Sequence, residues 1–137
     1  MKALDGLREL APNYDAILSD VWGVVHNGVT AHPAAAEALA EYRRQGGRVV
    51  LITNAPRPAG PIIEMLDGMG IPREAYDALV SSGGATRAIL AEEYRGHTLH
   101  YVGPPVENDA LFEGLDITLG SAEEASAVVV TDLDDDD

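Results

Sequence analysis

Short apolar runs alternate with helix-forming segments along most of this chain, and this alternation limits the possible folds more than any other feature. An apolar run that ends at a polar residue is typical of a buried strand, whereas a stretch that begins near proline and ends at glycine is typical of a helix. Strands that alternate with helices predict right-handed crossovers, and hence an α/β fold with a Rossmann-like parallel sheet and helices on both faces. We expect strands at residues 15–20, 48–54, 78–82, 98–103 and 127–132, helices at 33–46, 58–71 and 84–96, and shorter helices within 4–10 and 104–116.

The composition is that of a folded, acidic protein. The chain has 137 residues, 46% of them hydrophobic, which is enough for an ordinary core. Its 23 acidic and 9 basic residues give a net charge of -14, so we expect no nucleic-acid partner. Cysteine is absent, which excludes disulfides and thiolate zinc sites. The sequence contains neither an apolar run of membrane-spanning length nor a signal-peptide pattern, and we therefore expect a cytoplasmic protein without membrane contact.

Polar residues follow the predicted strands at the point where each strand ends. In open parallel sheets, ligands bind beyond the carboxyl ends of the strands. The residues to examine are therefore Asp20, the pair Thr53–Asn54, the pair Ser81–Ser82 and, at the end of the last predicted strand, Asp132.

Asp20 ends the first predicted strand, and two interpretations are open. A carboxylate at this position can cap the turn that follows the strand. It can also act as a nucleophile that forms a covalent intermediate. Gly23 favours the second interpretation, because glycine lets a turn bring backbone amides close to an anion.

Thr53 and Asn54 end the second predicted strand, and they too have two interpretations. Both residue types are good helix N-caps. Their hydroxyl and amide groups can also donate hydrogen bonds to phosphoryl oxygens. Because Asp20 ends the neighbouring strand, phosphoryl binding is the favoured interpretation.

The segments that contain these residues resemble, in order and spacing, the haloacid dehalogenase-like hydrolase superfamily, and within it the NagD-like class IIA branch. The segments are "DVWGVVHNG", "HPAAAEAL", "VVLITNAPRP" and "LVSSGGATRAIL". The resemblance implies that residues 1–95 form the N-terminal part of a core domain and that residues 96–137 begin an inserted α/β cap.

The resemblance also implies a role for each matching residue. Asp20 would be the nucleophile that forms an aspartyl-phosphate, and its other oxygen would bind Mg²⁺ together with the backbone carbonyl of Trp22. Thr53 and Asn54 would hold the phosphoryl group, with Gly23 in the phosphate-binding loop and Arg57 as a substrate contact. The implied partner is a small phosphorylated metabolite, and self-association into a homo-oligomer stays open.

Two departures from the family pattern limit how far the family's residue roles can be assigned to this chain. Trp22 occupies the position at which phosphatases of the family carry a second aspartate, the general acid and base. An indole does not exchange a proton at neutral pH, and His26 is the nearest side chain that could replace the acid. The family's later lysine motif is also missing, because Lys2 is the only lysine and precedes the nucleophile.

The acidic end of the chain has two interpretations as well. Asp132 with Asp135 or Asp136 could complete a small magnesium site. The favoured interpretation is that the chain ends within the cap, and is therefore the N-terminal half of an enzyme with little or no activity by itself. Two other functions remain open, a metal-independent dehalogenase-type hydrolase and a non-catalytic phosphate-binding module.

Overall fold

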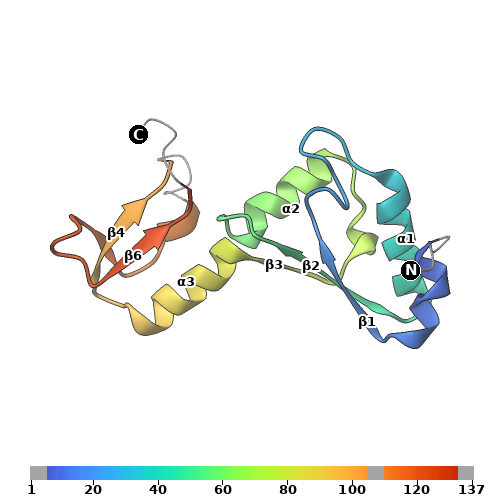
Figure 1. The fold of residues 1–137 in the computed structure, drawn as a ribbon, viewed down its shortest axis with the longest axis horizontal. Helices are drawn as coiled ribbons and strands as arrows, with labels where there is room; N and C mark the ends of the chain where they lie inside the picture. Colours follow the sequence, from blue (N-terminus) through green and yellow to red (C-terminus); the bar gives the residue numbers. More distant parts are fainter. Residues whose placement is uncertain (1–5, 105–109, 133–137) are drawn as a thin grey trace, which may run out of the picture. The chain divides into compact units, whose positions relative to one another are not determined.

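The computed structural model describes residues 6–104 and 110–132 of the chain. These residues form two compact units. The first unit comprises the chain up to Thr53 together with Gly60–Val80, and the second comprises Asn54–Ala59 together with the chain from Ser81 onward. Figure 1 shows the order of the elements.

The first unit contains a parallel three-stranded sheet in the order β1-β2-β3. The residues of β1 pair in register with those of β2, from Ala16 with Arg48 to Asp20 with Ile52. The elements are β1 (Ala16–Asp20), α1 (Pro33–Arg44), β2 (Arg48–Thr53), α2 (Ala59–Gly68) and β3 (Ala78–Ser81), with short 3-10 turns at η1 (Leu7–Glu9), η2 (Ala11–Asn13) and η3 (Arg73–Ala75). The parallel α/β fold predicted from the sequence is confirmed. The helix predicted within residues 4–10 is, in its described part, only the short turn η1, and Pro12 stands in the next turn, η2.

Helix α1 follows the signals that its sequence carries. Pro33 occupies its first turn, where a missing N–H costs nothing, and the helix packs against the core through its apolar side. After the helix, Gly46 adopts a φ of 96°, a conformation that glycine tolerates best. The Tyr42 hydroxyl donates a hydrogen bond to the Tyr14 carbonyl at 2.6 Å and thereby ties α1 to the segment before β1.

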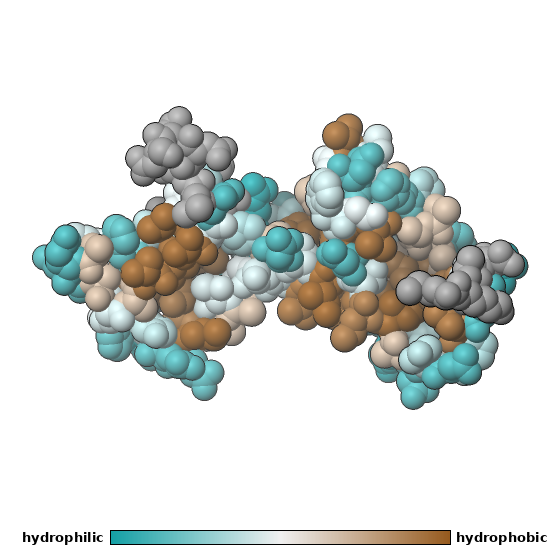
Figure 2. All heavy atoms as spheres, in the orientation of Figure 1, coloured by the Kyte–Doolittle hydropathy of each residue, from teal (hydrophilic) through white to brown (hydrophobic). Residues whose placement is uncertain are grey.

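One face of this sheet is covered and the other is exposed. Ser19, Val49, Leu51 and Thr53 are buried on the covered face. Right-handed crossovers that move steadily from β1 to β3 place both connecting helices on the same face, which explains the asymmetry. The opposite face exposes the large hydrophobic side chains Leu18 (68%), Ile52 (41%) and Val80 (50%), and Figure 2 shows hydrophobic residues gathered over this region.

The second unit contains helix α3 (Ser82–Glu93) and a sheet in the order β5-β4-β6. Its strands are β4 (Thr98–Val102), β5 (Thr118–Leu119) and β6 (Ala127–Val130), and both pairings are parallel. The buried core consists of Leu90, Leu99, Leu111 and Phe112. Because Leu90 lies on α3, this helix shares a core with the strands that follow it. The division into a core domain at residues 1–95 and a cap from residue 96 remains a prediction.

Strand β5 was not predicted, because it is only two residues long and exposed. No helix within residues 6–104 and 110–132 has the length and apolar character needed to cross a membrane.

Candidate active site

Asp20 and Thr53 lie at the carboxyl ends of two neighbouring parallel strands. Asp20 is the register partner of Ile52, and Thr53 is therefore one residue further along β2. Asp20 is exposed, whereas Thr53 is buried, with 8% of its surface accessible. The structure thus brings a carboxylate and a hydroxyl residue to the same edge of one sheet, as the sequence predicted.

The carboxylate of Asp20 uses one oxygen within the chain. Oδ1 accepts a hydrogen bond from the Val21 N–H at 2.7 Å, and the Ser19 hydroxyl donates to the Asp20 carbonyl at 3.0 Å. Within the part of the chain that the structure describes, Oδ2 has no hydrogen-bond partner. Asp20 therefore caps the turn after β1 with one oxygen, and its other oxygen has no partner among the described residues.

The loop between β1 and α1 is built by short backbone hydrogen bonds. The Gly23 N–H donates to the His26 carbonyl at 2.6 Å, and the Val25 N–H donates to the Val21 carbonyl at 2.9 Å. Gly23 has a φ of 78°, which glycine adopts without strain. Since its amide is engaged inside the loop, the contribution of Gly23 in this structure is to permit the turn.

His26 holds the other side of this loop. Its ring is buried, with 4% of the residue exposed, and Nδ1 accepts a hydrogen bond from the Gly28 N–H at 2.8 Å. Nδ1 therefore carries no proton. His26 also forms isolated β-bridges to Trp22 and Ala31. These contacts support a structural role, and the burial of the ring argues against His26 as a proton donor to substrate.

Trp22 is exposed on the loop, with 64% of its surface accessible. Its indole Nε1 lies 3.2 Å from the place that a Cβ atom on Gly28 would occupy, so the ring lies beside the backbone at Gly28. Among residues 6–104 and 110–132, no hydrogen bond ends on the Trp22 carbonyl oxygen. That oxygen is therefore available to a ligand.

The oxygen atoms of Asp20 and Trp22 are the ligand type that magnesium prefers. The described residues contain no group of three or more His, Cys, Asp or Glu side chains that could hold a metal ion. The Asp20 carboxylate and the Trp22 carbonyl thus fit a magnesium site that needs water, phosphate oxygens or further protein oxygens to complete it. The alternative site at the acidic end cannot be described, because Asp135 and Asp136 lie outside the described residues.

Asn54 and Arg57 lie on the segment after β2, which belongs to the second unit. Both residues are exposed. The Ser81 hydroxyl donates to the Arg57 carbonyl at 2.6 Å and accepts from the Gly84 N–H at 3.1 Å. Ser81, which is only 2% exposed, thus serves as the N-cap of α3 and as an anchor for the segment.

Gly83 supplies a second anchor for the same segment. Its N–H donates to the Ala55 carbonyl at 3.1 Å. A Cβ atom at this position would lie 2.5 Å from the backbone of Pro56 and Arg57, closer than real contacts allow. The sequence analysis noted Ser81 as a strand-end residue but missed this anchoring role. The pair of glycines in "SSGG" was the signal, since glycine in a helix often marks a close backbone approach.

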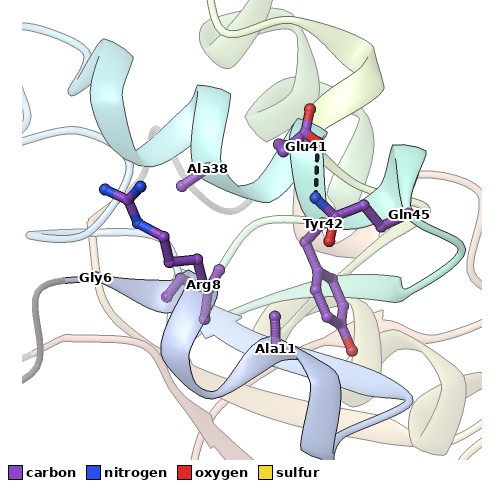
Figure 3. Close-up of a pocket in the computed structure, with 8 residues that line it drawn as sticks. Gly6, Arg8, Ala11, Ala38, Glu41, Tyr42 and Gln45 are labelled. Atoms are coloured by element: carbon purple, nitrogen blue, oxygen red, sulfur yellow. Dashed lines mark hydrogen bonds between the residues drawn. The ribbon is translucent and has the colours of Figure 1, made fainter.

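A pocket away from the strand ends lies in the first unit. It has a volume of about 210 Å³ and lies between the N-terminal 3-10 turns and α1. Figure 3 shows Arg8, Tyr42 and the hydrogen bond from the Gln45 amide to Glu41, which is 2.7 Å long. None of the predicted site residues lines it, and it therefore adds nothing to the chemistry at the strand ends.

Comparisons with known proteins give a family match and several similar solved structures. The family model of the haloacid dehalogenase-like hydrolases matches residues 17–117. A solved haloacid dehalogenase-like hydrolase from Brucella suis 1330 is 41% identical, with a TM-score of 0.85 over 97% of this chain and 50% of the other. No curated protein gives a significant match.

Two more distant structures share the fold. A 4-nitrophenylphosphatase from Thermotoga maritima is 22% identical, with a TM-score of 0.67 over 88% of this chain and 46% of the other. NagD from E. coli K-12 is 24% identical, with a TM-score of 0.62 over 85% of this chain and 45% of the other.

The chain thus spans about half the length of each of these structures. The predicted resemblance is confirmed by the family match and by these neighbours. This chain belongs to the haloacid dehalogenase-like hydrolase family.

Proposed function

We propose that this chain carries the nucleophile half of a magnesium-dependent phosphohydrolase that acts on a small phosphorylated metabolite in the cytoplasm. The observation that carries the proposal is the Oδ2 of Asp20, which has no partner among residues 6–104 and 110–132 and lies at the same sheet edge as Thr53. The name of the Thermotoga maritima neighbour, a 4-nitrophenylphosphatase, supports the choice of phosphate esters.

In the proposed reaction, Oδ2 of Asp20 attacks phosphorus. The bond from phosphorus to the ester oxygen breaks, and an aspartyl-phosphate forms. Water then attacks this intermediate and releases phosphate and the free carboxylate. Thr53 and Asn54 donate hydrogen bonds to the phosphoryl oxygens, and Arg57 contacts the substrate. When bound, magnesium would neutralise phosphoryl charge.

The leaving-group oxygen needs a proton that none of the residues assigned here supplies. Trp22 cannot donate one at neutral pH, and His26 is buried with Nδ1 already accepting a hydrogen bond. We therefore expect faster turnover of esters whose leaving group is stable as an anion, such as 4-nitrophenolate, than of alkyl esters.

The exposed face of the first sheet supports the proposal that the chain is part of a longer fold. Leu18, Ile52 and Val80 would normally be covered in a folded α/β domain. The relatives are about twice as long as this chain. We assign this face to the polypeptide that corresponds to the unmatched half of the Brucella suis relative.

A chimera tests the function. In it, residues 1–137 replace the matched half of the Brucella suis relative, and hydrolysis of 4-nitrophenyl phosphate is measured with and without MgCl₂. We expect magnesium-dependent turnover that Asp20→Asn abolishes while the circular dichroism spectrum stays the same. Unchanged turnover in the folded Asp20→Asn chimera would contradict the nucleophile assignment.

The same chimera separates the other two functions. Halide release from a 2-haloacid without metal would indicate the dehalogenase chemistry. Calorimetric binding of phosphate without turnover of any ester would indicate a binding module.

A further inference from the structure

The direction of the Trp22 carbonyl is set by the peptide unit to which it belongs. This peptide joins Trp22 to Gly23 and is trans. Because a trans peptide is planar, its C=O and its N–H point in opposite directions. The Gly23 N–H donates to the His26 carbonyl at 2.6 Å, which is short for an N–H donor. The place of the His26 carbonyl therefore decides where the Trp22 carbonyl points.

The backbone groups of Val21, the residue before, are used inside the turn. The Val21 carbonyl accepts the Val25 N–H at 2.9 Å, and the Val21 N–H donates to the Asp20 carboxylate at 2.7 Å. The Trp22 carbonyl, in contrast, accepts no hydrogen bond from residues 6–104 and 110–132. The Trp22 carbonyl can thus bind a cation without breaking a hydrogen bond of this turn.

The side chain of His26 fixes the place of its own backbone. The ring is buried, and its Nδ1 accepts the Gly28 N–H at 2.8 Å, which closes the turn between these two residues. Because Nδ1 accepts, the proton of the neutral ring is on Nε2. A ring held in one tautomer and one orientation restrains the His26 carbonyl at its position opposite the Gly23 N–H.

Backbone pairing holds His26 as well. The residue forms one β-bridge to Trp22 and a second, antiparallel β-bridge to Ala31. Next to the second bridge, the His32 N–H donates to the Val25 carbonyl at 2.7 Å. His26 thereby connects the part of the loop that carries Trp22 to the part that leads into α1.

We infer that His26 is a positioning residue, whose ring nitrogen and carbonyl together hold the Trp22 carbonyl in the orientation that binds magnesium. The inference rests on the proposed function, because magnesium belongs to that proposal. His26 itself touches neither the ion nor the substrate and transfers no proton. It acts through the Trp22–Gly23 peptide, as outer-shell hydrogen bonds orient metal ligands in general.

Two substitutions separate the acceptor of His26 from its shape. His26→Asn and His26→Leu introduce side chains of the same branched form, but only asparagine has an oxygen that can accept the Gly28 N–H in place of Nδ1. Hydrogen exchange of the Gly23 amide is followed by NMR in the isotope-labelled 137-residue chain. Exchange should be slow in the wild type and in His26→Asn. In His26→Leu it should be faster by about three- to tenfold, as expected for the loss of roughly one hydrogen bond.

The chimera gives the second readout. The MgCl₂ concentration for half-maximal hydrolysis of 4-nitrophenyl phosphate should rise about 10- to 100-fold in His26→Leu and less than about threefold in His26→Asn. The kcat at saturating magnesium should stay close to that of the wild type, because no ligand and no group that touches the substrate is removed. A residue that only supports the fold would not produce this split.

His97→Leu is the matched control. The His97 ring is exposed in the second unit, with Nδ1 3.1 Å from the Arg95 carbonyl, and its loss should change neither readout. If His26→Leu does not fold, the nitrogen NMR spectrum of the wild-type ring decides. A proton on Nε2 and none on Nδ1 supports the inference, and a proton on Nδ1 overturns it.

The outcomes separate the inference from the proposed function. If His26→Leu changes neither Gly23 exchange nor the magnesium requirement, or if His26→Asn is as impaired as His26→Leu, the inference is overturned and the phosphohydrolase proposal stands. If the wild-type chimera needs no magnesium, the proposed metal dependence fails. The role of His26 toward the ion then falls with it, whereas exchange in the expected order would still show that His26 orients the Trp22–Gly23 peptide.

Discussion

Ser81 and Arg57 are joined by a hydrogen bond of 2.6 Å from the buried Ser81 hydroxyl to the Arg57 carbonyl. The same hydroxyl accepts the Gly84 N–H at the start of α3. One side chain therefore fixes both the helix start and the segment that carries Asn54 and Arg57.

Ser81→Ala should lower the free energy of unfolding of the second unit. The loss of an N-cap costs about 0.5–2 kcal/mol, and the Arg57 carbonyl also loses its partner. Urea unfolding followed by circular dichroism measures the change. Ser82 is the exposed neighbour of Ser81, and Ser82→Ala is therefore the matched control. It should change the free energy of unfolding by less than about 0.5 kcal/mol. Equal effects of the two variants would show that Ser81 is not an anchor.

Gly83→Ala should also destabilise the fold, because the new methyl group would overlap the backbone of Pro56 and Arg57. Overpacking of this kind typically costs about 1–3 kcal/mol. Gly68→Ala provides the comparison within a helix, since no atom lies within 4 Å of the added Cβ there. That variant should be neutral or slightly stabilising, because alanine favours helix more than glycine does. Thermal melts of both variants distinguish a steric effect from a general intolerance of alanine.

Asp77 should make the first unit sensitive to acid. The Arg43 guanidinium donates to Asp77 Oδ1 at 2.7 Å, and the Val49 N–H donates to Oδ2 at 2.7 Å. These two hydrogen bonds, first that of Arg43, hold the pKa of Asp77 below its ordinary value of 3.8. The stabilisation is therefore complete above that ordinary value and is lost as the pH falls through the lower pKa of the folded protein.

Asp77→Asn accordingly should unfold at a lower urea concentration than the wild type at pH 7. The difference should persist down to about pH 4 and shrink below it. Asp116→Asn removes an exposed pair with Arg95, whose side chains are 70% and 78% accessible, and should have little effect at any pH. A pH-independent difference between wild type and Asp77→Asn would refute the role of the charge.

Leu18→Gln should destabilise the chimera much more than the 137-residue chain. In the 137-residue chain the Leu18 side chain is 68% exposed, so the change should cost less than about 0.5 kcal/mol. In the chimera the added half should cover the same position. The substitution should then lower the free energy of unfolding by about 2 kcal/mol or more. Urea unfolding of both forms measures the contrast, and equal small effects would mean that this face stays uncovered.

Local patterns in the sequence were enough to predict most of the first sheet and the residues at the carboxyl ends of its strands. Buried apolar runs ending at Asp20 and Thr53 predicted both strands, and Pro33 with the glycines after α1 predicted the helix between them. The position of these strand ends in one sheet followed from the crossover rule.

Features that depend on distant contacts could not be predicted in this way. The anchoring role of Ser81 depends on a partner 24 residues away, and the hydrogen bond between the Thr131 and Tyr101 hydroxyls joins residues 30 positions apart. Likewise, the hydrogen bond from the Gly23 N–H to the His26 carbonyl forms only in the folded loop. The sequence alone showed which of these residues were polar but not where each hydrogen bond would go.

Direct trapping of the covalent intermediate tests the central claim. The chimera is mixed with 4-nitrophenyl phosphate and MgCl₂, quenched in acid and reduced with borohydride, which converts an aspartyl-phosphate to homoserine. We predict homoserine at position 20, found by peptide mass spectrometry, and none in Asp20→Asn. Steady hydrolysis with an unmodified Asp20, or with the modification at another residue, would contradict the assignment of Asp20 as the nucleophile.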